Sequence, residues 1–393
     1  MLSLTKTENH TLMTYIPLYS AALAFVVTFF LIPPIINVAK VKKLYDVPNG
    51  RSSHTEITPS LGGIGIFAGM MMSLAFWAPF RAFATLQYVL VAFFIIFLIG
   101  VRDDILPLAP RKKLYGQIAA ALVLIFGAGV LITSLYGVFG VWGLPHWVAV
   151  LISLFTYIVV INSVNLIDGI NGLAGSLAVL LAGLFGTWFW MLGDVGYAVL
   201  SFSLLGATMG FLKYNYTPAR IFMGDTGSLL VGTTLAVLAI HFMEANGHLT
   251  PENPLWFDSV PAIVVSLLVL PLFDTMRVFI RRMLKGKSPF SPDKTHIHHV
   301  LLDLGLSHMQ ATGILVGGTL LFFGMAFLLQ SIGTTYLVLL IVGVATLVST
   351  LLSAYAKKRQ KTLDAKQDDF PLKGEIKVDA TEVVTTKVKV KQK

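Results

Sequence analysis

Long apolar runs separated by short polar connections dominate this sequence. Eleven such runs recur between about residues 16 and 355, and each is near the length that crosses a bilayer. They cover residues 16–39, 61–80, 86–101, 114–134, 147–162, 172–192, 196–212, 227–244, 258–277, 311–329 and 334–355. Unbroken apolar runs without strand-like alternation favour helices over a barrel. The pattern therefore predicts an all-α polytopic membrane protein with about eleven transmembrane helices.

Composition supports this class and excludes several others. Of the 393 residues, 55% are hydrophobic and only 12% are charged, which is far from an ordinary soluble domain. The absence of cysteine excludes disulfides, thiolate catalysis and cysteine-ligated metals. No cleavable signal peptide is evident at the first run. The net charge of +9 does not indicate nucleic-acid binding, because no compact basic domain carries it.

The basic residues predict the orientation of the chain. With the N-terminus outside, only Lys6 and Arg81 of the 29 Lys and Arg residues lie outside, and the rest face the cytoplasm. This bias is the one that the positive-inside rule describes. We therefore expect a cytoplasmic C-terminus, with the basic residues facing the headgroups of the lipid bilayer.

Two units follow from the same pattern. Residues 1–355 form the integral-membrane domain, and residues 356–393 form a charged cytoplasmic tail. The tail has few large apolar residues, so we expect it to be mostly disordered. Residues 383–390 alternate enough to pair as a strand with a partner.

Four carboxylates stand at the edges of apolar runs. They are Asp103, Asp104, Asp168 and Asp225. Burying a carboxylate is costly, so an acid next to a spanning helix is expected to face water, a cation or another acid. The predicted topology places all four at the cytoplasmic face. Hard oxygen ligands of this kind suit Mg²⁺, with Mn²⁺ as the alternative. We expect a metal site there.

Polar residues around these acids are candidates for binding an anionic substrate. Arg51, Lys112 and Lys113 lie in the first two cytoplasmic connections, and Asn162, Asn165, Asp168 and Asn171 recur every three residues in the third. The glycine-rich stretch 59–65 has two interpretations. Its backbone N–H groups approach a phosphate, or its small residues serve helix packing.

The connection between residues 277 and 310 carries a histidine cluster. His296, His298 and His299 follow Lys294 and Arg282. Three histidines within four residues could bind zinc. The carboxylates elsewhere favour magnesium, so we interpret the histidines and the two cations as donors to a pyrophosphate.

The ordered set of motifs resembles one family. Pro59-Ser60-Leu61-Gly62-Gly63, Asp103-Asp104, Asn162-x-x-Asn165-x-x-Asp168-Gly169, Phe222-Met223-Gly224-Asp225-Thr226-Gly227-Ser228 and His296-Ile297-His298-His299 occur in the order seen in the polyprenyl-phosphate N-acetylhexosamine-1-phosphate transferases. These bacterial membrane enzymes are related to the phospho-MurNAc-pentapeptide translocase of peptidoglycan synthesis. The resemblance covers about residues 16–355.

The resemblance implies a reaction and a location. A UDP-N-acetylhexosamine and undecaprenyl phosphate would give a lipid-linked pyrophosphate sugar and UMP at the cytoplasmic face of a bacterial inner membrane. Asp225 would be the primary Mg²⁺ ligand, with Asp104 and Asp168 beside it, and Asp103 would orient or deprotonate the acceptor. The histidines with Arg282 or Lys294 would hold the diphosphate, and Arg51, Lys112 and Lys113 the acceptor phosphate.

Some choices stay open at this point. Many relatives carry an acid at the position of Asn171, which can contact a nucleotide only through its amide. Ile297 interrupts the histidine run of the peptidoglycan translocases and favours the N-acetylhexosamine branch. GlcNAc is the expected sugar, and the MurNAc-pentapeptide is the alternative. A homodimer is left open. A cation-coupled transporter would instead place its acids near mid-membrane, in two repeated halves.

Overall fold

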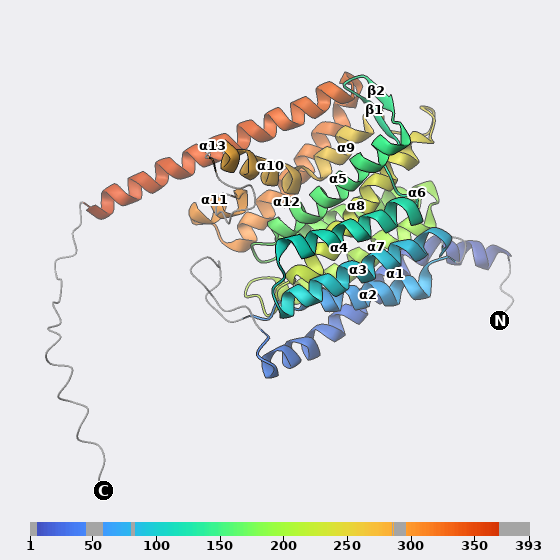
Figure 1. The fold of residues 1–393 in the computed structure, drawn as a ribbon, viewed down its shortest axis with the longest axis horizontal. Helices are drawn as coiled ribbons and strands as arrows, with labels where there is room; N and C mark the ends of the chain where they lie inside the picture. Colours follow the sequence, from blue (N-terminus) through green and yellow to red (C-terminus); the bar gives the residue numbers. More distant parts are fainter. Residues whose placement is uncertain (1–5, 45–57, 80–82, 285, 287–295, 369–393) are drawn as a thin grey trace, which may run out of the picture.

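The computed structural model describes residues 6–44, 58–79, 83–284, 286 and 296–368. Within these residues the chain folds as a bundle of long helices, with one small hairpin (Figure 1). In chain order the elements are α1 (Lys6–Val41), α2 (Gly62–Trp77), α3 (Phe83–Ile105), α4 (Pro110–Leu122), the π-helix η2 (Val123–Gly127), β1 (Ser134–Val138), β2 (Val141–Gly143), α5 (His146–Ile167), α6 (Leu173–Leu192), α7 (Val195–Asn215), α8 (Gly224–Gly247), α9 (Val260–Leu267), α10 (Val269–Leu284), α11 (Ile297–Asp303), α12 (His308–Leu328), the 3₁₀-helix η3 (Gln330–Ile332) and α13 (Thr334–Asp368).

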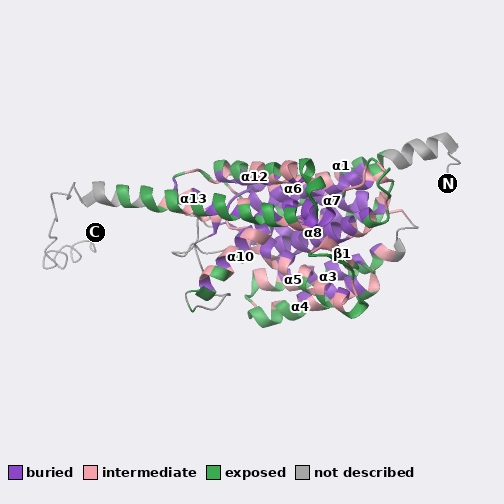
Figure 2. Ribbon diagram, turned by 90° about the horizontal axis from the view of Figure 1, so that it is seen from above, coloured by how far each residue is buried: buried purple, intermediate pink, exposed green. Residues whose placement is uncertain are grey.

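Helix α8 is the centre of the bundle. In the most apolar 18-residue stretch of α8, 94% of the residues are buried. In the corresponding stretches of α1 and α13, only 22% of the residues are buried. Helices α2, α3, α5 and α6 pack around it, and Figure 2 shows the burial concentrated on α7 and α8. The outer helices expose apolar side chains such as Phe30, Leu321 and Leu351. In a bilayer these side chains contact lipid, so the chain is an all-α, multi-pass membrane protein.

Each of the eleven predicted runs contains helix, but the runs differ in length. Among the described residues, eight helices are long and apolar enough to cross a membrane alone, and the bent pair α9–α10 would make a ninth. Helix α2, with 16 residues, is shorter. The run predicted over 114–134 is helical only to Gly127 and then leads into β1. The figure of eleven crossings and the orientation of the termini stay predictions.

The run predicted over 258–277 is broken. Helices α9 and α10 meet at an angle of 75° around Leu268. Pro271 explains the break, because it has no N–H and its ring collides with the carbonyl four residues earlier. That carbonyl belongs to Leu267, the last residue of α9.

Two further elements lie outside the predicted pattern. Strands β1 and β2 form an antiparallel hairpin, which Glu244 of α8 holds by accepting hydrogen bonds from Thr133 and Tyr136. Helix α13 continues past residue 355 to Asp368, so the first part of the predicted tail is helical. Residues 369–393, including the possible strand at 383–390, lie outside the described residues.

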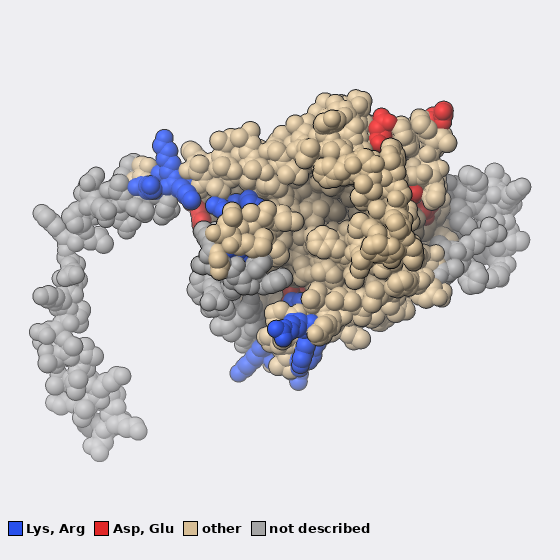
Figure 3. All heavy atoms as spheres, turned by 45° about the horizontal axis from the view of Figure 1, so that its top comes forward, with Lys and Arg blue, Asp and Glu red and all other residues tan. Residues whose placement is uncertain are grey.

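Charge is distributed unevenly over the two ends of the bundle. The ends of α3 and α5 and the start of α8 meet at one end, called here the carboxylate end because Asp103, Asp104, Asp168 and Asp225 lie there. Figure 3 shows Lys and Arg side chains gathered at the left and bottom of the view, whereas the most visible Asp and Glu side chains lie at the right, with only small acidic areas beside the basic ones. The four acids therefore share one end, as the sequence predicted.

Candidate active site

Asp104 of α3 caps the N-terminus of the central helix, α8. It lies near the end of α3, and its Oδ1 accepts a hydrogen bond from the backbone N–H of Asp225 at 2.7 Å. Its Oδ2 accepts from the backbone N–H of Thr226 at 3.0 Å and from the Thr226 hydroxyl. The residue that precedes α8, Met223, supplies no side-chain cap. Asp104 therefore satisfies the first N–H groups of α8 and places Asp225 at the positive end of a helix dipole.

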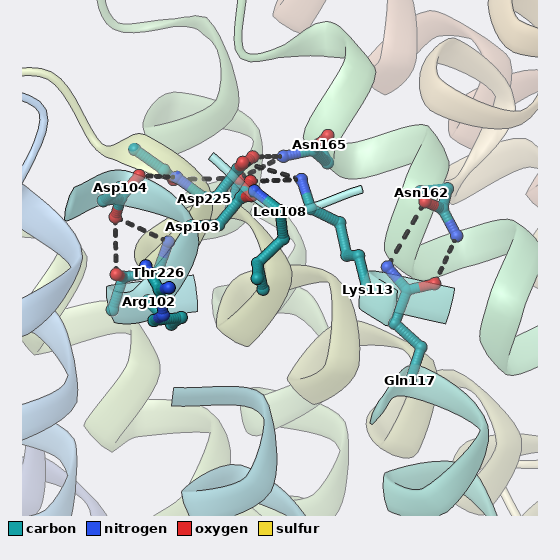
Figure 4. Close-up of polar contacts among 12 residues, drawn as sticks. Arg102, Asp103, Asp104, Leu108, Lys113, Gln117, Asn162, Asn165, Asp225 and Thr226 are labelled. Atoms are coloured by element: carbon teal, nitrogen blue, oxygen red, sulfur yellow. Dashed lines mark hydrogen bonds and ion pairs between the residues drawn. The ribbon is translucent and has the colours of Figure 1, made fainter. Parts of the chain in front are cut away.

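Lys113 joins two of the predicted acids. Its ammonium on α4 lies 2.7 Å from Oδ2 of Asp103 and 2.7 Å from Oδ2 of Asp225 (Figure 4). Burial disfavours the ammonium, but the two carboxylates outweigh burial and raise the pKa of Lys113 above its ordinary value. Lys113 is therefore charged at neutral pH. A cation thus sits between two carboxylates contributed by α3 and α8.

Asp103 is also fixed from its own loop. Its Oδ1 accepts a hydrogen bond from the backbone N–H of Leu108 at 2.6 Å, which closes the turn between α3 and α4. Because that turn leads directly into α4, it carries Lys113 to the two acids. The turn that connects Asp103 to Lys113 is therefore one structural unit.

The regularly spaced asparagines serve different partners. Asn165 donates to Oδ1 of Asp225 and to the Ser228 hydroxyl, 2.8 Å away, so it faces the acids. Asn162 instead exchanges hydrogen bonds with Gln117 of α4 at 2.8 and 3.3 Å (Figure 4). One turn of α5 thus positions Asp225, and the preceding turn attaches α5 to α4.

Asp168 lies in the loop just after α5. Burial, together with the nearby charges of Asp225 and Asp104, raises the pKa of Asp168 well above its ordinary value. Its carboxylate has no hydrogen-bond partner among the described residues, whereas Asp103, Asp104 and Asp225 each have several. Asp168 is therefore the acid with the most coordination capacity left.

Asn171 is buried and hydrogen-bonded to neighbouring residues rather than exposed to a substrate. Its side chain is 7% exposed and donates to Thr217 at 3.2 Å, and its backbone N–H donates to Nδ1 of His308. The buried Oδ1 of Asn171 has no hydrogen-bond partner. Gly172 follows in the left-handed region with φ of 80°, where only glycine is unstrained. Through the hydrogen bond from Asn171, His308 connects the loop to α12.

The histidine segment reaches the same loop. His298 is 2% exposed, and its ring lies against Gly169, where a Cβ would be 2.5 Å from Nε2. Its buried Nδ1 has no hydrogen-bond partner. Burial and the neighbouring His299 lower the pKa of His298 to about 3, so the ring is neutral at physiological pH. His298 thus lies against Gly169, the residue that follows Asp168 in the chain, as a neutral hydrogen-bonding group.

Asp274 is the site residue that sequence reasoning missed. It is 1% exposed in α10 and accepts from Nδ1 of His296 at 2.9 Å, from the backbone N–H of Ile297 at 3.0 Å and from Arg277 at 2.9 Å. It therefore anchors the histidine segment at the start of α11. The available signal was an acid inside the apolar run 258–277, the same signal that marked the other four.

We expect Asp274→Asn to destabilise the protein. The amide keeps the shape but leaves Arg277 and His296 without a buried negative partner, which should cost roughly 3 kcal/mol of unfolding free energy. Thermal unfolding in detergent measures the effect. Asp258→Asn, at an exposed position, is the control. Equal unfolding midpoints for the two variants would show that Asp274 is not an anchor.

The glycine-rich stretch 59–65 serves packing. The N–H groups of Gly62 and Gly63 donate to the carbonyls of Phe222 and Met223, each at 2.9 Å. A Cβ on Gly63 would lie 2.1 Å from the backbone nitrogen of Gly227. These glycines let α2 touch the start of α8, so the backbone groups at Gly62 and Gly63 are already occupied. Of the two interpretations, the structure favours close packing.

The remaining predicted residues are the basic residues and His299. Arg51 and Lys294 lie outside the described residues. Lys112 is exposed on α4. Arg282 is buried and contacts the ring of Phe279, and the rings of His298 and His299 are 4.3 Å apart. The structure therefore unites the acids, Lys113, Asn165 and His298, and places Asn162 in a separate contact.

The atoms at the carboxylate end that could coordinate a metal ion are carboxylate oxygens. No three acidic or histidine side chains among the described residues converge closely enough to share one cation. The set Asp225, Asp104 and Asp168 therefore stays a prediction. Lys113 nevertheless shows that Asp103 and Asp225 accommodate a positive charge between them.

Comparison with known proteins places the chain among sugar-phosphate transferases. Glycosyl transferase family 4 matches residues 86–243, a range that contains all four acids. The probable undecaprenyl-phosphate N-acetylglucosaminyl 1-phosphate transferase of Bacillus subtilis is 31% identical over 299 residues, or 73% of this chain and 79% of the relative. The decaprenyl-phosphate N-acetylglucosaminephosphotransferase of Mycobacterium tuberculosis is 33% identical over 328 residues, with 76% and 80% covered.

A third relative has the same character. The undecaprenyl-phosphate alpha-N-acetylglucosaminyl 1-phosphate transferase of Escherichia coli K12 is 30% identical over 283 residues, or 70% of this chain and 73% of the relative. The extent of these matches agrees with the ordered motifs and with the clustered acids. The chain therefore belongs to glycosyl transferase family 4, within the polyprenyl-phosphate N-acetylhexosamine-1-phosphate transferases that its motifs resemble.

Proposed function

We propose that this protein transfers GlcNAc-1-phosphate from UDP-GlcNAc to undecaprenyl phosphate, giving undecaprenyl-pyrophosphoryl-GlcNAc and UMP. The names of the relatives from Bacillus subtilis and Escherichia coli support the acceptor and the sugar. The observation that carries the proposal is the meeting of Asp103, Asp225 and Lys113 at one end of the bundle. We place this end at the cytoplasmic face of a bacterial cytoplasmic membrane, where UDP-sugars are made, and the basic side chains of this end support that orientation.

The reaction must bring negative charges together. An oxygen of the acceptor phosphate attacks the phosphorus that bears the sugar, and the bond from that phosphorus to the bridging oxygen breaks, releasing UMP. The acceptor phosphate has its second pKa near ~6 and is already largely dianionic at neutral pH. A general base therefore has little to do. Positioning and charge neutralisation should supply most of the rate enhancement.

The types of side chain at the carboxylate end suit a magnesium ion. The carboxylates are hard oxygen donors, and the place between two of them holds a positive charge in this structure. Mg²⁺ would be held by Asp225 and Asp168, with Asp104 supporting Asp225 through the backbone of α8. When bound, the ion would neutralise the diphosphate and the charge that develops on UMP.

The chain's own groups have complementary tasks. Asp103 holds Lys113 by an ion pair, and the ammonium is placed to attract the phosphates between the acids. Asn165 keeps the Asp225 carboxylate oriented through Oδ1. His298, neutral and packed against Gly169, can donate a hydrogen bond to a diphosphate oxygen. These assignments make Asp103 a positioning residue rather than a base.

We expect His298→Ala to raise the KM for the UDP-sugar by about tenfold, the value of one lost hydrogen bond to a charged group. Because the pKa of His298 lies far below neutrality, the ratio of variant to wild-type activity should be constant between pH 5.5 and 8.5. His146→Ala, at an exposed residue beyond the hairpin, is the control.

Two results would contradict this role. A ratio that changes steeply near pH 6.5 would indicate an imidazolium. Stoichiometric zinc in the active protein, with loss of activity to a zinc-selective chelator, would favour the metal interpretation of the histidines.

The reaction is tested by measuring UMP release with the purified full-length chain. Undecaprenyl phosphate is supplied with Mg²⁺ and one of several UDP-sugars, including UDP-GlcNAc and UDP-MurNAc-pentapeptide. Release from UDP-GlcNAc that requires the lipid phosphate supports the proposal. Release only from the pentapeptide donor would assign the translocase reaction instead. No release from any donor, combined with cation-driven solute uptake in vesicles, would indicate a transporter.

A further inference from the structure

A groove runs along the outside of the bundle, between α10 and α13. It has a volume of about 650 Å³ and also touches the end of α9. Its walls are mostly apolar, with Leu272, Met276 and Ile280 on one side and Ile341 and Val342 on the other. Met276, Ile280 and Val342 are each about half exposed, so the groove is open to its surroundings. None of Asp103, Asp104, Asp168 and Asp225 lines it.

The groove must be filled when the protein is in a membrane. Both α13 and the bent pair α9–α10 are apolar enough to cross a bilayer. The walls of an empty apolar groove between two such helices would lack dispersion contacts, so hydrocarbon chains are expected to enter it. Small polar residues such as Thr346 and Ser349 leave room along the wall of α13. An acyl chain of a lipid has the shape and polarity to lie along such a groove.

One end of the groove is positively charged. Arg277, Arg281 and Lys357 line it, and no acid is among the lining residues. Arg277 pairs with Asp274 and also donates to Ser353 of α13 at 3.4 Å, so it connects the two helices that form the groove. Arg281 and Lys357 have no acidic partner among the described residues. A basic pocket between spanning helices selects an anionic headgroup.

We propose that this groove binds one anionic phospholipid of the bilayer, with its phosphate at Arg281 and Lys357 and an acyl chain along α10 and α13. This lipid is not a substrate. None of the four acids to which an acceptor has to bring its phosphate lines the groove. Lipid binding in the groove can therefore be measured separately from the proposed reaction.

Binding at this place has a structural consequence. Arg277 lines the groove, and its partner Asp274 holds the histidine segment through His296 and Ile297. A lipid that joins α10 to α13 therefore braces the anchor of that segment. We expect the bound lipid to stabilise the fold, and neutral phosphatidylcholine to do so less, because it offers no net negative charge to Arg281 and Lys357.

The test measures lipid binding rather than transfer. The full-length protein is placed in nanodiscs of phosphatidylcholine with a small fraction of photoreactive phosphatidylglycerol, and labelled peptides are identified. For wild type we expect labelling on α10 and α13, competed by phosphatidylglycerol but not by phosphatidylcholine. Arg281→Gln with Lys357→Gln should weaken this labelling about tenfold or more, since two basic contacts are lost.

Matched variants separate the groove from general surface charge. Lys40→Gln with Lys358→Gln removes two exposed cations that do not line the groove, and it should label like wild type. Ala354→Trp places a bulky side chain in the groove without changing charge and should also weaken labelling. It keeps the proposal testable if the double glutamine variant does not fold.

Several outcomes would overturn the proposal. Equal loss in the control pair would mean unspecific attraction of lipid to a basic surface. Equal competition by phosphatidylcholine would remove the headgroup preference. Competition by undecaprenyl phosphate far below the effective concentration of phosphatidylglycerol would assign the groove to the acceptor instead.

Discussion

Replacing Asp225 by asparagine should lower turnover by about 10³-fold. The amide keeps the size of the side chain but removes the charge that faces both Lys113 and the predicted Mg²⁺. In the wild type, a carboxylate oxygen of Asp225 accepts a hydrogen bond from Asn165. An amide has N–H donors of its own, so this orienting hydrogen bond is weakened in the variant. The measurement is UMP release from UDP-GlcNAc over a range of Mg²⁺ concentrations.

The control for this prediction lies at the other end of the bundle. Asp194 caps α7 and pairs with His241 at 2.8 Å, so Asp194→Asn also removes a partly buried acid at a helix end. We expect Asp194→Asn to leave the Mg²⁺ response unchanged. If Asp225→Asn keeps full turnover and the wild-type Mg²⁺ optimum, Asp225 has no part in a metal site.

Lys113→Met should lower turnover by about 10²-fold and change the Mg²⁺ dependence. Without the ammonium, Asp103 and Asp225 face each other with no cation between them, and like charges at close range are unfavourable. One of the two acids would then take up a proton or bind an additional cation. Lys113→Arg, which keeps the charge, should recover part of the activity.

Arg111→Met is the matched control for Lys113. Arg111 is exposed in the first turn of the same helix and has no partner at the acids. We expect wild-type kinetics for this variant. Identical turnover and Mg²⁺ dependence in Lys113→Met and Arg111→Met would mean that the bridge between the acids is only a structural contact.

The sequence alone predicted the class, the approximate helices and the common end of the four acids. These depend on local quantities: the length of an apolar run, the cost of a charge beside lipid, and the bias of basic residues. In a chain that crosses a bilayer repeatedly, the side on which a connection emerges follows from counting. Asp103 and Asp225 could therefore be assigned to one end although 122 positions separate Asp103 from Asp225 in the numbering.

Tertiary structure decided what each polar residue contacts. The spacing of Asn162 and Asn165 is regular, yet one meets Gln117 and the other Asp225, because neighbouring turns of α5 face different helices. Asp104 resembles Asp103 in sequence, but it caps α8 while Asp103 holds Lys113. Such pairings depend on which helix ends are packed together, and no local pattern encodes that.

The break at Leu268 and the buried acid Asp274 are two further features that tertiary structure decided. Pro271 marks a possible bend in the sequence, but whether a proline bends or ends a helix depends on the partners that its freed carbonyl finds. Asp274 is tolerated in an apolar run because the fold brings His296, Ile297 and Arg277 to it. Hydropathy, charge bias and motif order were enough to locate the site along the chain. The hydrogen bonds and ion pairs that arrange it arise only when distant helices pack, because each needs both partners at close range.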